Sequence, residues 1–221
     1  MLETERKLEQ DFVATARANE SAPTGWPAAL LMFHVGMWRE RLRDSLARMQ
    51  EGKDYPRPPS NIDEFNETEL AQGIGTPLTD AAARADHLLA EIIELYDKVG
   101  ERPIEWNMSK TTTEAVLRSS FTHPRTHIAQ YYRENGEGER ARRLTEETVD
   151  ELRETDAPPL VLGAALYNLA VVRAGEGRSD QALALLREAF PMRPDLKAAA
   201  AKDSDLGTLC DDARLQELLK P

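Results

Sequence analysis

Apolar residues recur at intervals of three or four along most of this chain, which is the spacing that predicts amphipathic helices. The predicted helices cover residues 2–19, 27–49, 76–99 and 114–135. The second begins at Pro27, since proline is favoured in a first turn, and the threonines at 111–113 supply caps for the fourth, which stops at Gly136. No segment shows a convincing alternation with period two. The pattern therefore predicts an all-α fold.

Two stretches rich in helix-breaking residues separate these helices. "EGKDYPRPPSNIDEF", residues 51–65, has too much proline and glycine to continue a helix, and is interpreted as a loop that crosses one end of a bundle. "GERPIEWNMSKTTT", residues 100–113, breaks the third helix from the fourth. Four amphipathic helices with a long crossing connection predict a four-helix bundle.

The fourth helix carries a pair of histidines in "SFTHPRTHIAQYY", residues 120–132. His123 and His127 are four apart, so they share one helix face and can present two imidazoles to one ion. His34 lies within the apolar stripe of the second helix and points inward as well. Three inward histidines without cysteine suit zinc, nickel or another divalent first-row metal, with positions left for water or substrate. The alternative is that these histidines bind no metal and are either hydrogen-bonded within the protein or exposed to solvent. His87 lies beside the apolar stripe of the third helix, and we interpret it as a partly exposed surface histidine.

Composition narrows the classes of function. The formal net charge of −11 argues against nucleic-acid binding, which depends on clustered lysine and arginine. A single cysteine, Cys210, permits neither an internal disulfide nor a cysteine-rich zinc site. The N-terminus is charged from residue 3 onward, and the most apolar stretch is shorter than a membrane span. We therefore expect a soluble, cytoplasmic protein without membrane or nucleic-acid partners.

Two segments resemble a known metal-binding superfamily. "TGWPAALLMFHVGMWRERL" and "EAVLRSSFTHPRTHIAQYYRENGE" are similar to the second and fourth helices of DinB/YfiT-like proteins, over about residues 5–136. The resemblance implies that residues 1–138 form a DinB-like metal-binding bundle and that His34, His123 and His127 are its metal ligands. Pro124 departs from the pattern, because proline removes a backbone hydrogen bond; it should kink the helix or mark its start, and a kink would turn His123 away from the ion.

The last third of the chain resembles a different family. "GAALYNLAVVRAGEGRSDQALALLREAFPMRPDLK", residues 163–197, is similar to one tetratricopeptide repeat. Small residues at Ala170 and Ala182 would let two antiparallel helices approach closely, and Gly177 would permit the turn between them. We expect residues 139–221 to form a tetratricopeptide-like helical segment docked on the bundle, because a single repeat buries little core alone.

Two classes of function remain open. The DinB-like resemblance implies a metal-dependent transferase or hydrolase acting on a small-molecule substrate, with a low-molecular-weight thiol as co-substrate. The other class is a non-catalytic adaptor that binds a protein partner through its repeat. Three inward histidines are costly to keep without purpose, which favours the enzyme. Arg41 and Tyr131 are expected to face the site and orient a substrate, and a homodimer is compatible with the sequence.

Overall fold

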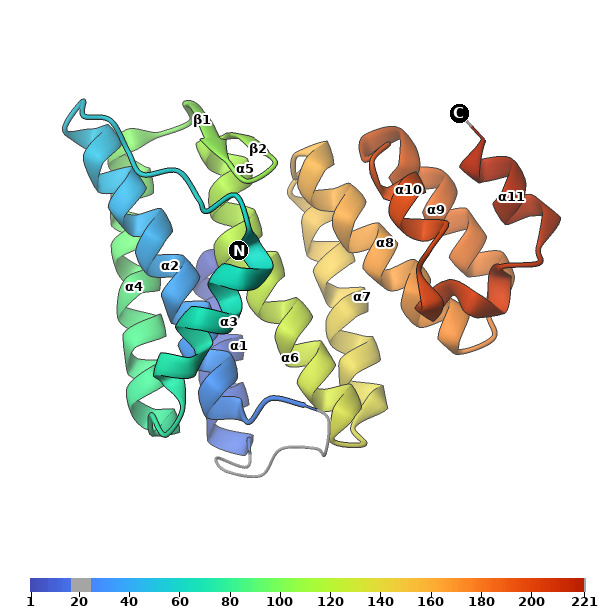
Figure 1. Cartoon of the computed structure of the whole chain (residues 1–221), viewed down its shortest axis with the longest axis horizontal. Helices are drawn as coiled ribbons and strands as arrows, with labels where there is room; N and C mark the ends of the chain where they lie inside the picture. Colours follow the sequence, from blue (N-terminus) through green and yellow to red (C-terminus); the bar gives the residue numbers. More distant parts are fainter. Residues whose placement is uncertain (17–24, 221) are drawn as a thin grey trace. The chain divides into compact units, whose positions relative to one another are not determined.

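A computed structural model describes residues 1–16 and 25–220 of the chain (Figure 1). Almost all of its elements are helices, so the all-α prediction is confirmed. The chain divides into two compact units, Met1–Ala141 and Arg142–Pro221. The first predicted helix was expected to reach residue 19, but it ends at Thr15, and residues 17–19 of that prediction lie outside the described part of the chain.

The first unit has the predicted character of a helix bundle. Its helices are α1 (Leu2–Thr15), α2 (Ala28–Gln50), α3 (Ile62–Gly73), α4 (Leu78–Val99), α5 (Thr112–Leu117), the π-helical turn η1 (Arg118–Thr122) and α6 (His123–Glu134). Helices α2 and α4 form its most extensive contact, and Gly36 of α2 lies against Ala85 of α4 there. Thr111 and Glu114 form a reciprocal capping box at the start of α5, as the run of threonines predicted.

The long connection after α2 is partly helical, which corrects the prediction of a loop over residues 51–65. Helix α3 begins at Ile62, where the side chain of Asn61 accepts a hydrogen bond from the Glu64 amide at 3.3 Å. The breaking residues of this stretch end at Pro59, and Asn61 is a good N-cap, so nothing prevents a helix from residue 62 onward.

A small antiparallel hairpin joins α4 to α5, formed by β1 (Pro103–Trp106) and β2 (Ser109–Thr111). The prediction that no segment alternates with period two is wrong here, because exposed and buried residues alternate along β1. Ile104 and Trp106 are its buried residues, and they join the core of α2 residues Trp38 and Leu42. Four residues are too short for such a pattern to be recognised in the sequence.

Helices also form the second unit, and the division between the units falls in the first turn of α7. The elements are α7 (Gly138–Glu154), α8 (Pro159–Gly175), α9 (Ser179–Met192), α10 (Leu196–Ala200), the 3-10 turn η2 (Ser204–Leu209) and α11 (Ala213–Leu219). Ala170 and Ala182 are fully buried in the core that α8 and α9 share, and Gly177 turns the chain between these helices with a φ of +72°. Both observations agree with the roles that the sequence predicted for these small residues.

Within residues 1–16 and 25–220, no helix combines the length and the apolar character needed to cross a bilayer. Helix α2 has 23 residues, but its second half carries several arginine and acidic side chains.

Candidate metal centre

The three histidines that the sequence singled out lie together in the first unit. His34 comes from the second turn of α2, and His123 and His127 come from the first two turns of α6. The Nε2 atom of His123 lies 3.0 Å from His34 Nε2 and 3.1 Å from His127 Nε2. One nitrogen from each ring lies within 4.8 Å of the other two. Among the described residues this is the one group of histidine, cysteine or acidic side chains with such spacing.

Hydrogen bonding alone accounts poorly for this convergence. Each nitrogen of a neutral imidazole carries either a proton or a lone pair, but not both. His123 Nε2 would have to share one proton or one lone pair between two neighbouring nitrogens, at 3.0 and 3.1 Å. A cation satisfies all three at once, because each Nε2 can direct its lone pair at the same point. Nitrogen atoms about 3.0–3.4 Å apart also suit a metal bound at about 2.0–2.1 Å from each.

The electrostatics of the site keep the rings neutral, which is the protonation state that binds a metal. Burial, and secondly the charge of His127, lowers the pKa of His34 to about 3. Burial lowers the pKa of His127 to about 4. Burial followed by the charges of the other two histidines lowers the pKa of His123 well below its usual value. All three imidazoles are therefore unprotonated at neutral pH.

These depressed pKa values predict how the stability of the metal-free protein depends on pH. Below about pH 6.5 the unfolded chain takes up protons on its histidines, whereas the folded chain does not protonate His127 until the pH approaches 4. The free energy of unfolding should therefore fall as the pH falls, by about 2 kcal/mol for His127 between pH 7 and pH 5. Urea unfolding in the presence of a chelator measures this quantity.

The matched control is His127→Gln, whose amide does not titrate. Acidic groups such as Glu5 titrate in both proteins, so their contributions cancel in the difference. The variant should lose less stability between pH 7 and pH 5 than the parent. Equal losses in the two proteins would show that His127 is not held neutral by burial.

A π-helical turn places the histidine pair. Residues 118–122 form η1, and α6 begins directly after it, with Pro124 in its first turn. Proline lacks the N–H that would bond the carbonyl four residues earlier, and a wider turn accommodates this loss. Of the two outcomes expected for Pro124, the structure shows the start of a helix. His123 is not turned away, because its Nε2 is the nitrogen that the other two rings approach.

Trp26, just before α2, packs on the histidine rings. Its indole stacks on His127 with ring centroids 5.4 Å apart and an interplanar angle of 18°, and it meets His34 edge-on at 5.0 Å. The preceding Gly25 lies beside the side chain of Glu134, near the end of α6. Since His34 Nδ1 and His123 Nδ1 are buried without a hydrogen bond to a described residue, ring packing is the main restraint on these side chains.

Two buried ion pairs connect α1 to the helices of the site. Arg39 of α2 and Glu9 of α1 pair through both carboxylate oxygens, at 2.8 and 2.5 Å. Arg125 of α6 donates to Glu5 of α1 at 2.5 Å and lies over the ring of Phe121. Burial raises the pKa of Glu5, and the charge of Arg125 opposes that shift. The sequence prediction missed these pairs, although Glu5 and Glu9 lie four residues apart on the same face as the buried Phe12.

The other residues considered for the site have different surroundings. The guanidinium of Arg41 lies 4.3 Å from the ring centroid of Phe65 in α3. Tyr131 is buried and meets Phe12 edge-on at 5.2 Å. Their role in orienting a substrate stays a prediction. The side chain of His87 is 74% exposed, 3.8 Å from Glu91, as the sequence predicted for a surface histidine.

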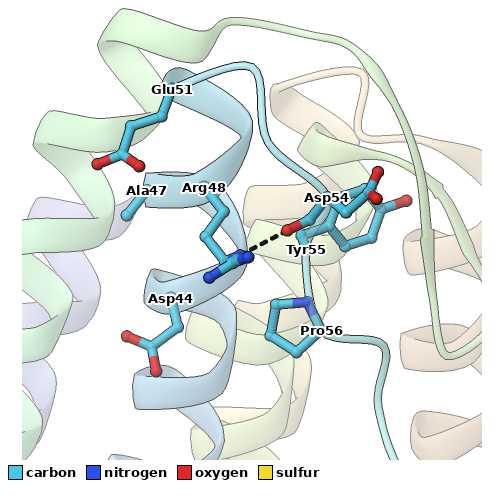
Figure 2. Close-up of a pocket in the computed structure, with 7 residues that line it drawn as sticks. All are labelled: Asp44, Ala47, Arg48, Glu51, Asp54, Tyr55 and Pro56. Atoms are coloured by element: carbon cyan, nitrogen blue, oxygen red, sulfur yellow. Dashed lines mark hydrogen bonds between the residues drawn. The ribbon is translucent and has the colours of Figure 1, made fainter.

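A hollow of about 620 Å³ lies at the C-terminal end of α2, away from these histidines in the sequence. It is lined by Asp44, Ala47, Arg48, Glu51, Asp54, Tyr55 and Pro56 (Figure 2). Arg48 donates to the carbonyl of Asp54 at 2.5 Å, as Figure 2 shows. The carboxylates of Asp44 and Glu51 lie 2.9 and 2.7 Å from Arg43 and Lys53. Two of its acidic groups thus pair with basic residues outside the lining, and the histidine cluster is the better candidate for chemistry.

The fold and the cluster together define a helical-bundle protein with a three-histidine centre. Comparisons with protein families, with curated proteins and with solved structures gave no match. The resemblance to DinB/YfiT-like proteins and to a tetratricopeptide repeat stays a prediction.

Proposed function

We propose that His34, His123 and His127 bind one divalent ion, zinc or nickel, and that the chain is a metal-dependent transferase or hydrolase. The observation that carries the proposal is that His123 Nε2 lies 3.0 and 3.1 Å from the Nε2 atoms of His34 and His127, with one nitrogen of each ring within 4.8 Å of the others. Three protein ligands leave coordination positions for water or substrate, which is the pattern of catalytic rather than structural sites. The resemblance to DinB-like proteins supports the same assignment.

The chain's own residues supply binding and orientation around this centre. The three imidazoles are neutral without any proton loss at neutral pH, because burial lowers their pKa values. Trp26 covers one face of His127 and restricts access from that direction. A bound divalent ion supplies a Lewis acid that lowers the pKa of a thiol or water and polarises an electrophile. This chemistry suits a small electrophilic substrate and a low-molecular-weight thiol.

The experiment compares metal-loaded parent protein with His34→Ala over a panel of thiols and small electrophiles. The parent should accelerate conjugation or hydrolysis of at least one electrophile in a metal-dependent way. His34→Ala should show no such acceleration, while its far-ultraviolet circular dichroism remains helical. A panel without any metal-dependent rate would refute the enzyme.

The alternative is an adaptor that uses the second unit to bind a protein partner. The α8–α9 hairpin favours it, with Ala170 and Ala182 buried in the shared core and a glycine turn between the helices. A single helical hairpin of this kind offers a small groove, so the histidine centre carries the first proposal. Failure of the enzyme panel would make the adaptor the leading proposal.

A further inference from the structure

We propose that Arg39 is a positioning residue of the metal centre, because its guanidinium donates to the Ser120 carbonyl in the π-helical turn that sets His123. The inference rests on the proposed metal centre. Arg39 does not hydrogen-bond to any of the three histidines among the contacts described, so it would act on them through the turn. Ser120 lies three residues before His123, and Arg39 lies five residues after His34, so one side chain connects the two helices that carry the ligands.

Arg39 is held in one orientation by its surroundings. Its side chain is 0% exposed, and it is among the largest fully buried side chains described. Nη1 donates to Glu9 at 2.8 Å and to the Ala85 carbonyl at 3.1 Å. Nη2 donates to Glu9 at 2.5 Å and to the Ser120 carbonyl at 3.3 Å. The planar guanidinium thus links α1, α2, α4 and η1, a geometry that a lysine ammonium cannot reproduce.

The Ser120 carbonyl is the group that Pro124 affects. In an α-helix this carbonyl would accept from the amide of residue 124, and proline has no such proton. A hydrogen bond to such a carbonyl typically contributes about 0.5–1.5 kcal/mol. The Arg39 guanidinium provides a donor from another helix and so stabilises the turn in the conformation that proline requires.

The turn matters to the centre because it sets the rotation of α6. One residue corresponds to about 100° around an α-helix. The extra residue accommodated in η1 therefore fixes which way His123 and His127 face relative to α5. A turn that relaxes, because its carbonyl has lost the Arg39 donor, would move His123 first, since it is the first residue after η1.

A purely structural role for Arg39 makes a different prediction, and one pair of substitutions distinguishes the two. Glu9→Met together with Arg39→Met removes both charges and keeps similar volume, a change that is often neutral or stabilising for a buried pair. It also removes the donor to Ser120. If Arg39 serves stability alone, the double variant should bind metal like the parent; if it positions His123, affinity should fall although the fold persists.

The test measures zinc affinity by competition with a chromophoric chelator, alongside thermal melting of the metal-free proteins. We expect the double variant to stay folded and melt cooperatively, and to bind zinc about 10–100-fold more weakly, the effect typical of outer-shell partners. The visible spectrum of the cobalt-loaded protein should change as well. The control is Arg6→Gln with Asp86→Asn, which removes the α1–α4 ion pair and should leave zinc affinity unchanged.

Arg39→Lys provides a second variant in case the double variant does not fold. Its ammonium can keep the charge beside Glu9 but cannot also reach Ser120, so zinc affinity should fall with the fold retained. If the folded double variant or the folded Arg39→Lys variant bound zinc with the parent's affinity, the positioning role of Arg39 would be overturned and the proposed metal centre would stand. A parent that binds no zinc would overturn the metal centre, and with it this inference.

Discussion

Replacing His34, His123 and His127 together by alanine is expected to abolish metal binding. The parent should retain about one zinc or nickel ion per chain after desalting, because its three neutral imidazoles lie close enough to bind the same ion. Elemental analysis of both proteins measures the difference. Each single alanine variant should also bind weakly, with a loss above the ~10–100-fold typical of outer-shell changes, because two imidazoles hold an ion poorly.

A second measurement on the same proteins guards against a metal bound elsewhere. An ion that binds only the folded protein stabilises it by about 2.7 kcal/mol at a concentration 100 times its dissociation constant. Zinc should therefore raise the melting temperature of the parent but not of the triple variant. His87→Ala removes the exposed histidine and should behave like the parent. A triple variant that keeps the parent's metal content would show that the site is assigned to the wrong residues.

Among these substitutions, Glu5→Ala should cause the largest loss in the free energy of unfolding. Glu5→Ala takes away the carboxylate that Arg125 contacts at 2.5 Å, where both side chains are at most 2% exposed. The arginine keeps its charge at any accessible pH, so the variant must bury a guanidinium without this partner. We expect a loss of about 3–5 kcal/mol in the free energy of unfolding, measured by urea denaturation at pH 7.

An exposed ion pair provides the comparison for Glu5. Arg57 and Glu105 lie 2.9 Å apart, and both side chains are more than 60% exposed. Arg57→Ala should leave the urea midpoint close to that of the parent, because solvent screens such pairs. If Glu5→Ala were as mild as Arg57→Ala, the buried pair would contribute little to the bundle.

The clustering of the three histidines was predictable because they follow helical periodicity. His34 lies within an apolar stripe, and His123 and His127 are four apart, so helix geometry alone brings each to an inward face. That the two helices bring their histidines within 3.0 Å of each other could not be derived, because packing between distant segments leaves no local pattern.

The structural supports of the centre were harder to predict. A charged residue on a buried face is recognised as a partner only when its counterion is known, and Glu5 and Arg125 are 120 residues apart. The π-helical turn depends jointly on Pro124 and on the donor from Arg39, so neither residue signals it alone. The short β1 strand was missed for a simpler reason, since four residues show too few alternations.

The long sequence separation of the Glu5–Arg125 pair has a consequence for how the first unit folds. Closing a loop of this length has a large entropic cost before any contact compensates for it. During synthesis, α1 leaves the ribosome more than a hundred residues before the arginine that it pairs with. Glu9 can pair with Arg39 once α2 has been made, whereas Glu5 has no access to Arg125 until α6 has been made. The Glu5 end of α1 therefore docks in a late step, after the arginine of α6 is available.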